Sequence, residues 1–258
     1  MGIQFDTVPS AYGTLHLCIL GAIVVLTVAA FFLLRKRSEK ALVWLLFGLG
    51  VFMIVTEVLK QIFVWFYVYE RVPSAWFFPW QLCSMAMYLC VLVPLLKGKA
   101  QETVLVFLAS FSLLAAVFAL AFPGDMLRPQ ILLFCHSFVY HAIMVIESLA
   151  AILILSRRKK AKFLPALILF LAMSVVAEVI NVVSYNLFPE RGRASNMFNI
   201  TPYYPSTQPV FHDIALKYGV IPEILLYTVL IALDAYVLYW IEYGLMRVHV
   251  NRRGLHIR

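Results

Sequence analysis

The feature that most constrains the fold of this chain is a series of seven apolar stretches. A helix needs about 20 predominantly apolar residues to cross the hydrocarbon core of a bilayer, which is roughly 30 Å thick. The stretches that meet this requirement lie at residues 14–34, 41–66, 78–96, 103–122, 130–155, 163–185 and 220–245. They predict an all-α, polytopic membrane protein, with one transmembrane domain spanning residues 1–258 as a seven-helix bundle.

The composition excludes a soluble globular protein. Of the 258 residues, 63% are hydrophobic and 13% are charged, whereas soluble domains average about 45–50% apolar and about 25% charged residues. In a soluble protein, the net charge of +8 would raise the question of nucleic acid binding. Here the Lys and Arg residues cluster between apolar stretches, which indicates membrane topology. We therefore expect the bilayer and no nucleic acid as a partner, and a multi-pass location in a cell membrane.

The distribution of Lys and Arg predicts the orientation. Fifteen of them fall in alternate loops and the C-terminal tail, against five in the remaining loops. The larger group comprises Arg35, Lys36, Arg37, Lys40, Lys97, Lys99, Arg157, Arg158, Lys159, Lys160, Lys162, Arg247, Arg252, Arg253 and Arg258. The smaller group comprises Arg71, Arg128, Arg191, Arg193 and Lys217. Because cytoplasmic loops carry the excess of positive charge, the N-terminus is predicted outside and the C-terminus in the cytoplasm.

One connection is much longer than the others. Residues 186–219 contain four prolines and the sequence TPYYPSTQPVF. A loop of this length is usually functional or disordered. Its aromatic residues favour an ordered cap on the outer side, and a plain connector is the alternative.

Ionisable and polar residues within membrane spans are costly, and they usually face the bundle interior, a cavity or a partner. We measured their depth from the inner basic residues, at about 1.5 Å per residue along a helix. Cys83 lies about 21 Å from Lys97, and His141 about 24 Å from Arg157. The other members lie about 24–30 Å from their own anchors; they are Glu57, Lys60, Glu178, Asn181 and His16. These residues from five predicted helices share one layer in the outer third of the bilayer, and His136 lies near its outer boundary.

Each of these residues also has a purely structural interpretation. Cysteine in a membrane helix most often fills space as a small apolar residue. A single histidine or asparagine can join two helices by a hydrogen bond. Glu57 and Lys60, at positions i and i+3 of one helix, can neutralise each other.

The shared depth also permits nucleophilic catalysis. A thiol becomes a good nucleophile when a neighbour lowers its pKa or accepts its proton, and a histidine does both. His141 matches Cys83 in depth better than His136 does, so it is the preferred partner. Acidic or amide groups such as Glu178 or Asn181 can orient the histidine or bind an oxyanion. In a membrane, the natural electrophile is a lipid ester.

Several motifs resemble the YwaF-like family, which includes the animal transmembrane protein 164. FPWQLCSMAMYL, at the beginning of the third predicted span, resembles that family's Leu-Pro-x-His-Leu-Cys motif. SFVYHAIMVIESL resembles its fifth span around a histidine, and LHL at His16 resembles its first span. Asn181 and the later NMFNITPYYPS resemble its segment after the sixth span. This chain departs from the pattern at Gln81, where many relatives have histidine.

The resemblance implies a fold of seven spans and an activity. Animal members are described as acyltransferases that remodel phospholipids through a cysteine and a histidine. Carried over to the matching positions, this implies Cys83 as the nucleophile and His141 as the general base, separated by a similar number of residues. It also implies phospholipid and lyso-phospholipid substrates.

Three functions therefore remain open at this point. The first is a phospholipid acyltransferase or transacylase, which becomes a lipid-ester hydrolase if water accepts the acyl chain. The second is a transporter or small-ligand binding bundle whose polar layer handles ions or protons; this requires a polar route to the inner face. The third is a structural protein in which the polar layer fixes helix register. The sequence has no Gly-rich phosphate loop, no HExxH and no CxxC, so we expect neither a cofactor nor a metal.

Overall fold

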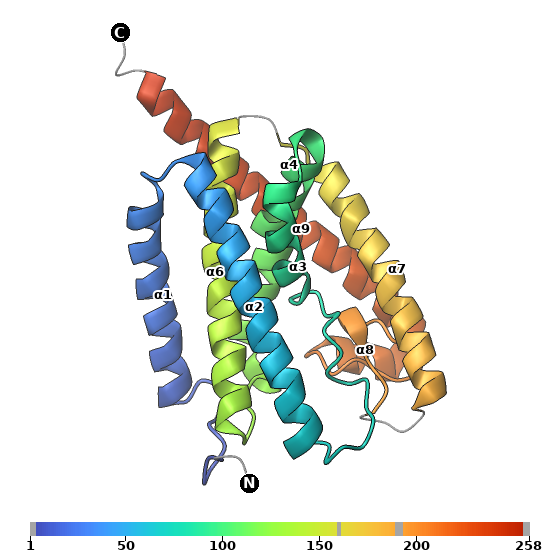
Figure 1. The fold of residues 1–258 in the computed structure, drawn as a ribbon. Coiled ribbons are helices and arrows are strands. Elements are labelled where there is room, and N and C mark those ends of the chain that lie inside the picture. Colours follow the sequence, from blue (N-terminus) through green and yellow to red (C-terminus); the bar gives the residue numbers. More distant parts are fainter. Residues whose placement is uncertain (1–3, 159–160, 189–192, 255–258) are drawn as a thin grey trace.

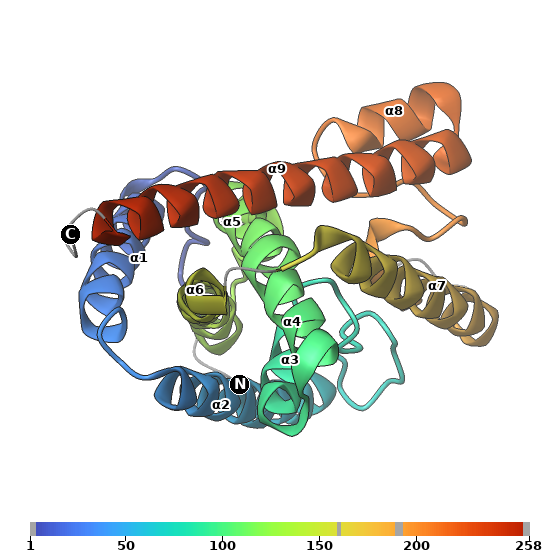
Figure 2. The ribbon, with the colours of Figure 1, turned by 90° about the horizontal axis from the view of Figure 1, so that it is seen from above.

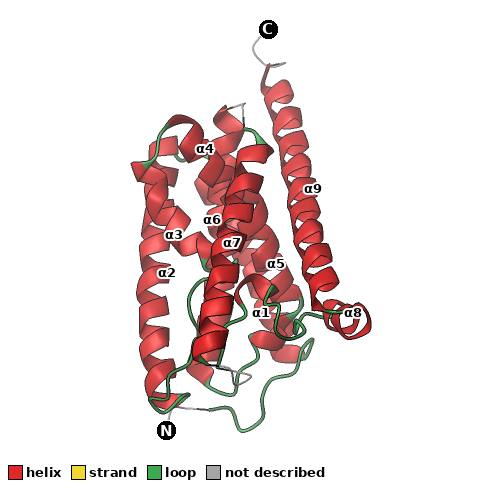
Figure 3. Ribbon diagram, turned by 90° about the vertical axis from the view of Figure 1, so that its right-hand side faces the viewer, coloured by secondary structure: helices red, strands yellow, loops and turns green. Residues whose placement is uncertain are grey.

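The computed structural model describes residues 4–158, 161–188 and 193–254. Four of the cations used to predict the orientation lie outside these residues: Lys159, Lys160, Arg191 and Arg258. The described residues form helices, turns and loops, with one isolated β-bridge between Gln4 and Gln130 (Figure 3).

Nine α-helices follow one another in the described part of the chain. They are α1 (Thr14–Leu34), α2 (Glu39–Tyr67), α3 (Met85–Leu92), α4 (Gly98–Phe107), α5 (Leu113–Ala121), α6 (Ile131–Arg158), α7 (Phe163–Leu187), α8 (Phe211–Tyr218) and α9 (Val220–Gly254). Three short 3₁₀ helices accompany them: η1 (Val93–Leu95), η3 (Pro123–Asp125) and η4 (Met197–Asn199). The segment η2 (Leu108–Ser112) is a π-helical turn. The predicted all-helical membrane architecture is therefore confirmed.

The predicted count of seven spanning helices is not confirmed. Among the described residues, six helices are long and apolar enough to cross a membrane; they are α1, α2, the continuous helix Gly98–Ala121, α6, α7 and the Val220–Glu242 part of α9. The third predicted span, 78–96, is helical only over Met85–Leu95. The chain nevertheless crosses the bundle at this point, because an irregular segment leads from the end of α2 to α3 (Figure 1).

The irregular segment between α2 and α3 is held by hydrogen bonds to a distant loop. The Ala75 amide donates to the Arg193 carbonyl at 2.7 Å, and the Gln81 side chain donates to the Asn196 carbonyl at 2.9 Å. Pro79 disfavours helical geometry at the residue before it. Non-helical backbone at membrane depth is tolerated where it is buried in protein or lines a cavity, and most of the segment from Trp76 to Ser84 lines a cavity.

Helix α6 lies near the middle of the bundle (Figure 2). It contacts α1, α2, α4, α5 and α9. Helix α1 is peripheral, and most of its apolar side chains are exposed. Helix α9 crosses obliquely over one side and packs against α8 and η2. The exposed apolar side chains of α1, α7 and α9 are those that a bilayer covers, because lipid replaces water around them.

Several basic residues lie at one end of the bundle, where the ends of α2, α4 and α6 contact one another. Arg158 at the end of α6 forms an ion pair with Glu39 at the beginning of α2, and it donates to Gln101 Oε1 at 2.8 Å. Arg157 donates to the Arg35 carbonyl at 3.2 Å. The loop between α2 and α3, the loop between α5 and α6, and the loop after α7 lie at the opposite end (Figure 1). Which end faces the cytoplasm stays a prediction.

A π-helical turn interrupts the long helix formed by α4 and α5. Such turns are frequent at functional sites and leave backbone groups that need other partners. Ser148 Oγ donates to the Leu108 carbonyl at 2.8 Å. Ser112 Oγ donates to Glu147 Oε1 at 2.6 Å, and the Cys90 thiol donates to Glu147 Oε2 at 2.7 Å. Glu147 is fully buried, so these contacts fix the π-helical turn against α3 and α6.

Candidate functional site

A cavity of about 590 Å³ lies at the end of the bundle opposite the basic cluster. Its wall comes from the last third of α2, the loop before α3, α5, the loop between α5 and α6, the first part of α6, the loop around η4, the segment before α8, and the first half of α9. Six of the nine residues predicted for the site line this cavity. They are Glu57, Lys60, Gln81, Cys83, His136 and His141.

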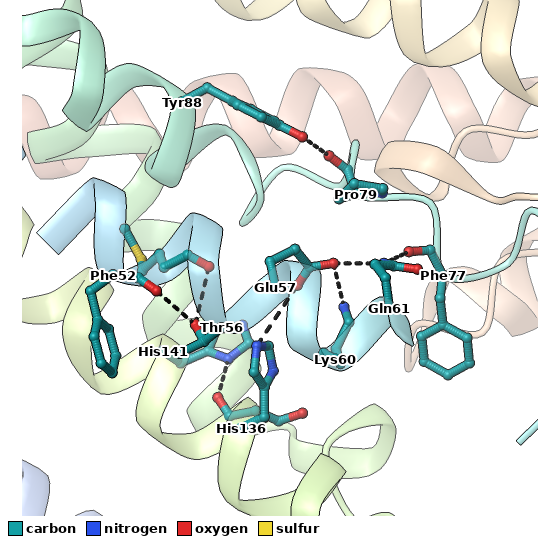
Figure 4. A network of polar contacts seen from close by, with 12 residues as sticks. Phe52, Thr56, Glu57, Lys60, Gln61, Phe77, Pro79, Tyr88, His136 and His141 are labelled. Atoms are coloured by element: carbon teal, nitrogen blue, oxygen red, sulfur yellow. Dashed lines mark hydrogen bonds and ion pairs between the residues drawn. The ribbon is translucent and has the colours of Figure 1, made fainter. Parts of the chain in front are cut away.

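Glu57 is the centre of the polar contacts on this wall (Figure 4). Its side chain is buried, and its Oε1 accepts from Lys60 Nζ and from Gln61 Nε2, each at 2.7 Å. Helical spacing explains the contacts, because residues three and four apart lie on one face. His136 Nε2 on α6 lies 3.8 Å from Glu57 Oε2. Glu57 and Lys60 therefore form the ion pair that the structural interpretation of the sequence predicts, and this ion pair also borders the cavity.

The hydrogen bonds of His141 define its tautomer. His141 Nδ1 lies 2.7 Å from the Ser137 carbonyl, one helical turn earlier on α6 (Figure 4). A carbonyl oxygen only accepts, so Nδ1 carries the proton. In neutral imidazole the other nitrogen, Nε2, then has a free lone pair. His141 is thus held in the form that can accept a proton at Nε2.

Cys83 lines the same cavity, but on a different local structure from the one predicted. The sequence places it on a membrane helix, whereas the structure places it in the turn before α3, two residues ahead of Met85. The prediction of a regular helix through Cys83 is therefore wrong, because the residues before Met85 are not helical. The depth of Cys83 stays a prediction, since it is counted from Lys97 along residues that are helical from Met85 to Leu95. Cys83 as a residue is half-buried, whereas Cys90 is fully buried.

Gln81 and Asn181 hold the loop after α7. Gln81 Oε1 accepts from the Phe198 amide at 2.9 Å. Asn181 Oδ1 accepts from the Met197 amide at 2.6 Å, and its Nδ2 donates to the Met197 carbonyl at 3.1 Å. Phe198 and Asn199 adopt positive φ angles of 57° and 58°, which are uncommon for residues other than glycine. The two side-chain amides satisfy the backbone groups of this buried turn.

His16, Glu178 and Asn181 do not line the cavity. His16 is fully buried, and its Nδ1 accepts from the Tyr12 amide while its Nε2 contacts the Leu120 carbonyl, both at 3.0 Å. A carbonyl accepts, so Nε2 is the donor. His16 therefore fastens the beginning of α1 to α5, which matches its structural interpretation. Glu178 is half-buried on α7.

The cavity wall also includes polar residues for which no site role is predicted from the sequence. Among them are Arg128, which is used above only to predict the orientation, Tyr140, which directly precedes His141, and Asp234 on α9. One feature of the sequence could have indicated Tyr140 as a site residue, because it directly precedes His141. No feature of the sequence indicated Arg128 as a site residue, because basic residues in short loops are typical of membrane topology. Within the described ranges, no group of three or more His, Cys, Asp and Glu side chains has a metal-binding arrangement.

Comparison with known proteins places the chain in a family. The model of the TMEM164 family matches residues 11–241. No curated protein and no solved structure matches the chain. The family match covers all the predicted spans almost completely, and it includes Cys83, His141 and every other residue of the cavity wall. This protein is therefore a multi-pass membrane protein and belongs to the TMEM164 family.

Proposed function

We propose that this protein is a membrane-embedded phospholipid acyltransferase that works through an acyl-thioester on Cys83. The observation that carries the proposal is that Cys83 and His141, from separate elements, line one cavity whose wall has a charged part and a large apolar part. A phospholipid likewise has a charged headgroup and apolar acyl chains. The family resemblance supports the same pair of residues.

The first half-reaction forms the thioester. His141 Nε2 accepts the proton of the Cys83 thiol, and the sulfur attacks the carbonyl carbon of a phospholipid acyl ester. The tetrahedral intermediate collapses when the carbon–oxygen bond to the glycerol breaks. His141 returns the proton to that oxygen, so a lyso-phospholipid leaves and the acyl chain remains on Cys83.

The second half-reaction passes the acyl chain on. The hydroxyl of another lyso-phospholipid gives its proton to His141 Nε2 and attacks the thioester carbonyl. The carbon–sulfur bond breaks, and the sulfur takes the proton back from His141. Water in place of the lyso-phospholipid would give a free fatty acid, so excluding water from the cavity favours transfer over hydrolysis.

Lipid access to this cavity is supported by the exposure of its apolar lining. Four apolar residues line the cavity and are each between 36% and 68% exposed: Phe118 on α5, Phe122 directly after α5, Val210 before α8 and Leu230 on α9. An acyl chain that enters from the bilayer on this side would contact these side chains. The alternative of a transporter has less support, because this cavity's wall comes from one end of the bundle, and a transporter needs a route to both ends.

The test is to incubate the purified protein with phospholipid carrying a labelled acyl chain and to isolate the adduct. We expect a hydroxylamine-sensitive adduct on residue 83 that disappears in Cys83→Ala. Cys135→Ala is the matched control, since Cys135 is an exposed cysteine outside the cavity wall, and it should keep the adduct. His141→Gln should slow adduct formation by about 10²–10⁴-fold. A hydroxylamine-sensitive thioester that persists in Cys83→Ser would exclude Cys83 as the nucleophile.

A further inference from the structure

Two cationic side chains of the cavity wall approach the same aromatic ring. Lys60 Nζ on α2 and Arg128 Cζ, in the loop before α6, each lie 5.7 Å from the centre of the Phe77 ring. All three residues line the cavity. The side chains of Lys60 and Arg128 are 16% and 33% exposed, so both are partly accessible. Figure 4 shows Lys60 between the Glu57 carboxylate and Phe77.

Most hydrogen-bond donors of these two cations have no protein partner in the described ranges. Arg128 Nε donates to the Asp125 carbonyl at 2.9 Å. Its terminal nitrogen Nη2 comes no closer than 4.0 Å to the Asp125 carboxylate, which is outside hydrogen-bond distance. Lys60 Nζ has one short contact, with Glu57 Oε1 at 2.7 Å. The guanidinium fork of Arg128 and two N–H groups of Lys60 are therefore left for a ligand.

We propose that Lys60 and Arg128 bind the phosphate group of a phospholipid or lyso-phospholipid over the Phe77 ring. This inference rests on the proposed function for the identity of the lipid, but the binding itself needs no reaction. Arginine forks match phosphate oxygens in a two-bond arrangement, and lysine adds a point charge. The glycerol backbone separates the phosphate from the ester carbonyls by only a few bonds, so both subsites belong in one cavity, as they are here.

The acidic neighbours predict the relative importance of the two cations. Glu57 is buried and already paired with Lys60, so it offsets much of the charge that Lys60 presents to the cavity. Asp125, with a side chain that is 66% exposed, is partly solvated and lies further from Arg128. Arg128 therefore supplies most of the attraction for phosphate, and removing it should weaken binding more than removing Lys60.

The experiment measures lipid binding in the Cys83→Ala protein, which cannot turn the lipid over. Phosphatidylcholine and phosphatidate are compared with diacylglycerol, which lacks the phosphate, by native mass spectrometry in detergent. We expect Arg128→Gln to weaken binding of both phospholipids at least tenfold and Lys60→Met to weaken it less. Binding of diacylglycerol should be unchanged by either. Arg71→Gln is the control: Arg71 stacks on Phe66 and lies outside the cavity wall, so its loss should have no effect.

Two results would overturn the proposal: equal loss of phospholipid and diacylglycerol binding in Arg128→Gln, or no loss of either. Inorganic phosphate and glycerol 3-phosphate test the source of the phosphate. If they displace phosphatidate at micromolar concentration, the site is one for free phosphate. Arg128→Lys, which keeps the charge without the fork, should show intermediate binding and serves as the test if Arg128→Gln unfolds.

The outcome is separable from that of the proposed function. If no thioester forms on Cys83 but phospholipid binding depends on Arg128, the reaction is wrong and the phosphate site remains. If the thioester forms normally in Arg128→Gln and phospholipid binding is unchanged, the phosphate site is wrong and the reaction remains.

Discussion

At the scale of single residues, buried polar side chains divide into those that hold the backbone and those that border the cavity. Asn181 and His16 use both their donor and acceptor atoms on other protein groups. Asn181 and His16 therefore have structural roles, although their predicted depths match those of the residues that line the cavity. Cys83, His141 and Lys60 differ from them, since each lines the cavity. In the described parts of the chain, His141 Nε2 and two N–H groups of Lys60 also lack a hydrogen-bond partner.

Asn181→Ala should lower the stability of the protein markedly. It removes three hydrogen bonds from the turn at Ser195–Met197 and leaves buried backbone groups of Met197 without partners. A buried group left unpaired costs about 1–3 kcal/mol. Thermal unfolding in detergent measures the loss, and hydrogen exchange should increase at residues 195–199. Asn186→Ala is the control, because Asn186 is exposed and bonds only to its own helix. An unchanged unfolding temperature for Asn181→Ala would contradict this role.

Tyr140→Phe should leave the stability unchanged or raise it. The Tyr140 hydroxyl is buried and has no hydrogen-bond partner within the residues described, whereas its ring packs against His136 with centroids 5.5 Å apart. Phenylalanine keeps the ring and removes an unsatisfied group, which contributes up to about 1 kcal/mol. Tyr88→Phe provides the contrast: it removes a 3.0 Å bond to the Pro79 carbonyl and should lower the unfolding temperature. A clear destabilisation by Tyr140→Phe would reveal a partner for its hydroxyl.

At the scale of elements, the position of α3 depends on a close approach to α2. The two helices meet at Gly50, where an added Cβ would lie 2.8 Å from Cys90 Cβ and 2.9 Å from the Met87 carbonyl. These distances are shorter than carbon–carbon and carbon–oxygen contacts allow, and the second involves backbone. The glycine is therefore required by packing and not by its backbone conformation.

Gly50→Ala should push α3 away from α2 and destabilise the protein, by about 1–3 kcal/mol as is typical of overpacking. Because Cys83 lies directly before α3, adduct formation should also slow. Gly48→Ala is a matched control two residues away on the same helix, where nothing lies within 4 Å of an added Cβ. That variant should be neutral or slightly stabilising, since alanine favours helix over glycine. Equal effects of the two variants on the unfolding temperature would contradict the packing argument.

At the scale of the whole molecule, the cavity occupies one end of the bundle. Its walls come from loops and helix ends that the charge distribution predicts to lie outside. A reagent that cannot cross the membrane should therefore reach Cys83 from that side only. The four cysteines differ in exposure: Cys90 is buried, Cys83 is half-buried, and Cys18 and Cys135 are exposed. Once the two exposed cysteines are replaced, a thiol reagent can therefore report on Cys83.

In the Cys18→Ala, Cys135→Ala double variant, we expect a membrane-impermeant maleimide to label Cys83 from the outside of sealed vesicles and not from the inside. The measurement is the mass of the labelled peptide in vesicles of each orientation. Labelling from the inside alone would reverse the predicted orientation. Labelling from neither side, with labelling restored in the unfolded protein, would show that the cavity is closed to water. Cys90 should be labelled only after unfolding.

The sequence by itself determined that this is a membrane protein with an all-helical fold, and it located the six long apolar helices of the described residues. Their signal is the summed transfer free energy of about 20 consecutive residues, which does not depend on the partners of each helix. The same reasoning found five residues that line the cavity, because polar groups in a span need a polar surrounding; they are Glu57, Lys60, Cys83, His136 and His141. It could not separate them from Asn181, Glu178 and His16, which have the same residue types and similar depths.

Only the tertiary structure decided how the third passage folds. Residues 68–84 are mostly non-helical because their backbone and side chains bond to residues 193–198, more than 100 positions later in the chain. An apolar count cannot register such a partner, so it predicts one regular helix through Cys83. The cavity and the pairing of Arg128 with Lys60 around Phe77 depend on that fold in the same way. Local hydrophobicity is additive along the chain, whereas hydrogen bonds between distant segments exist only after the chain has folded.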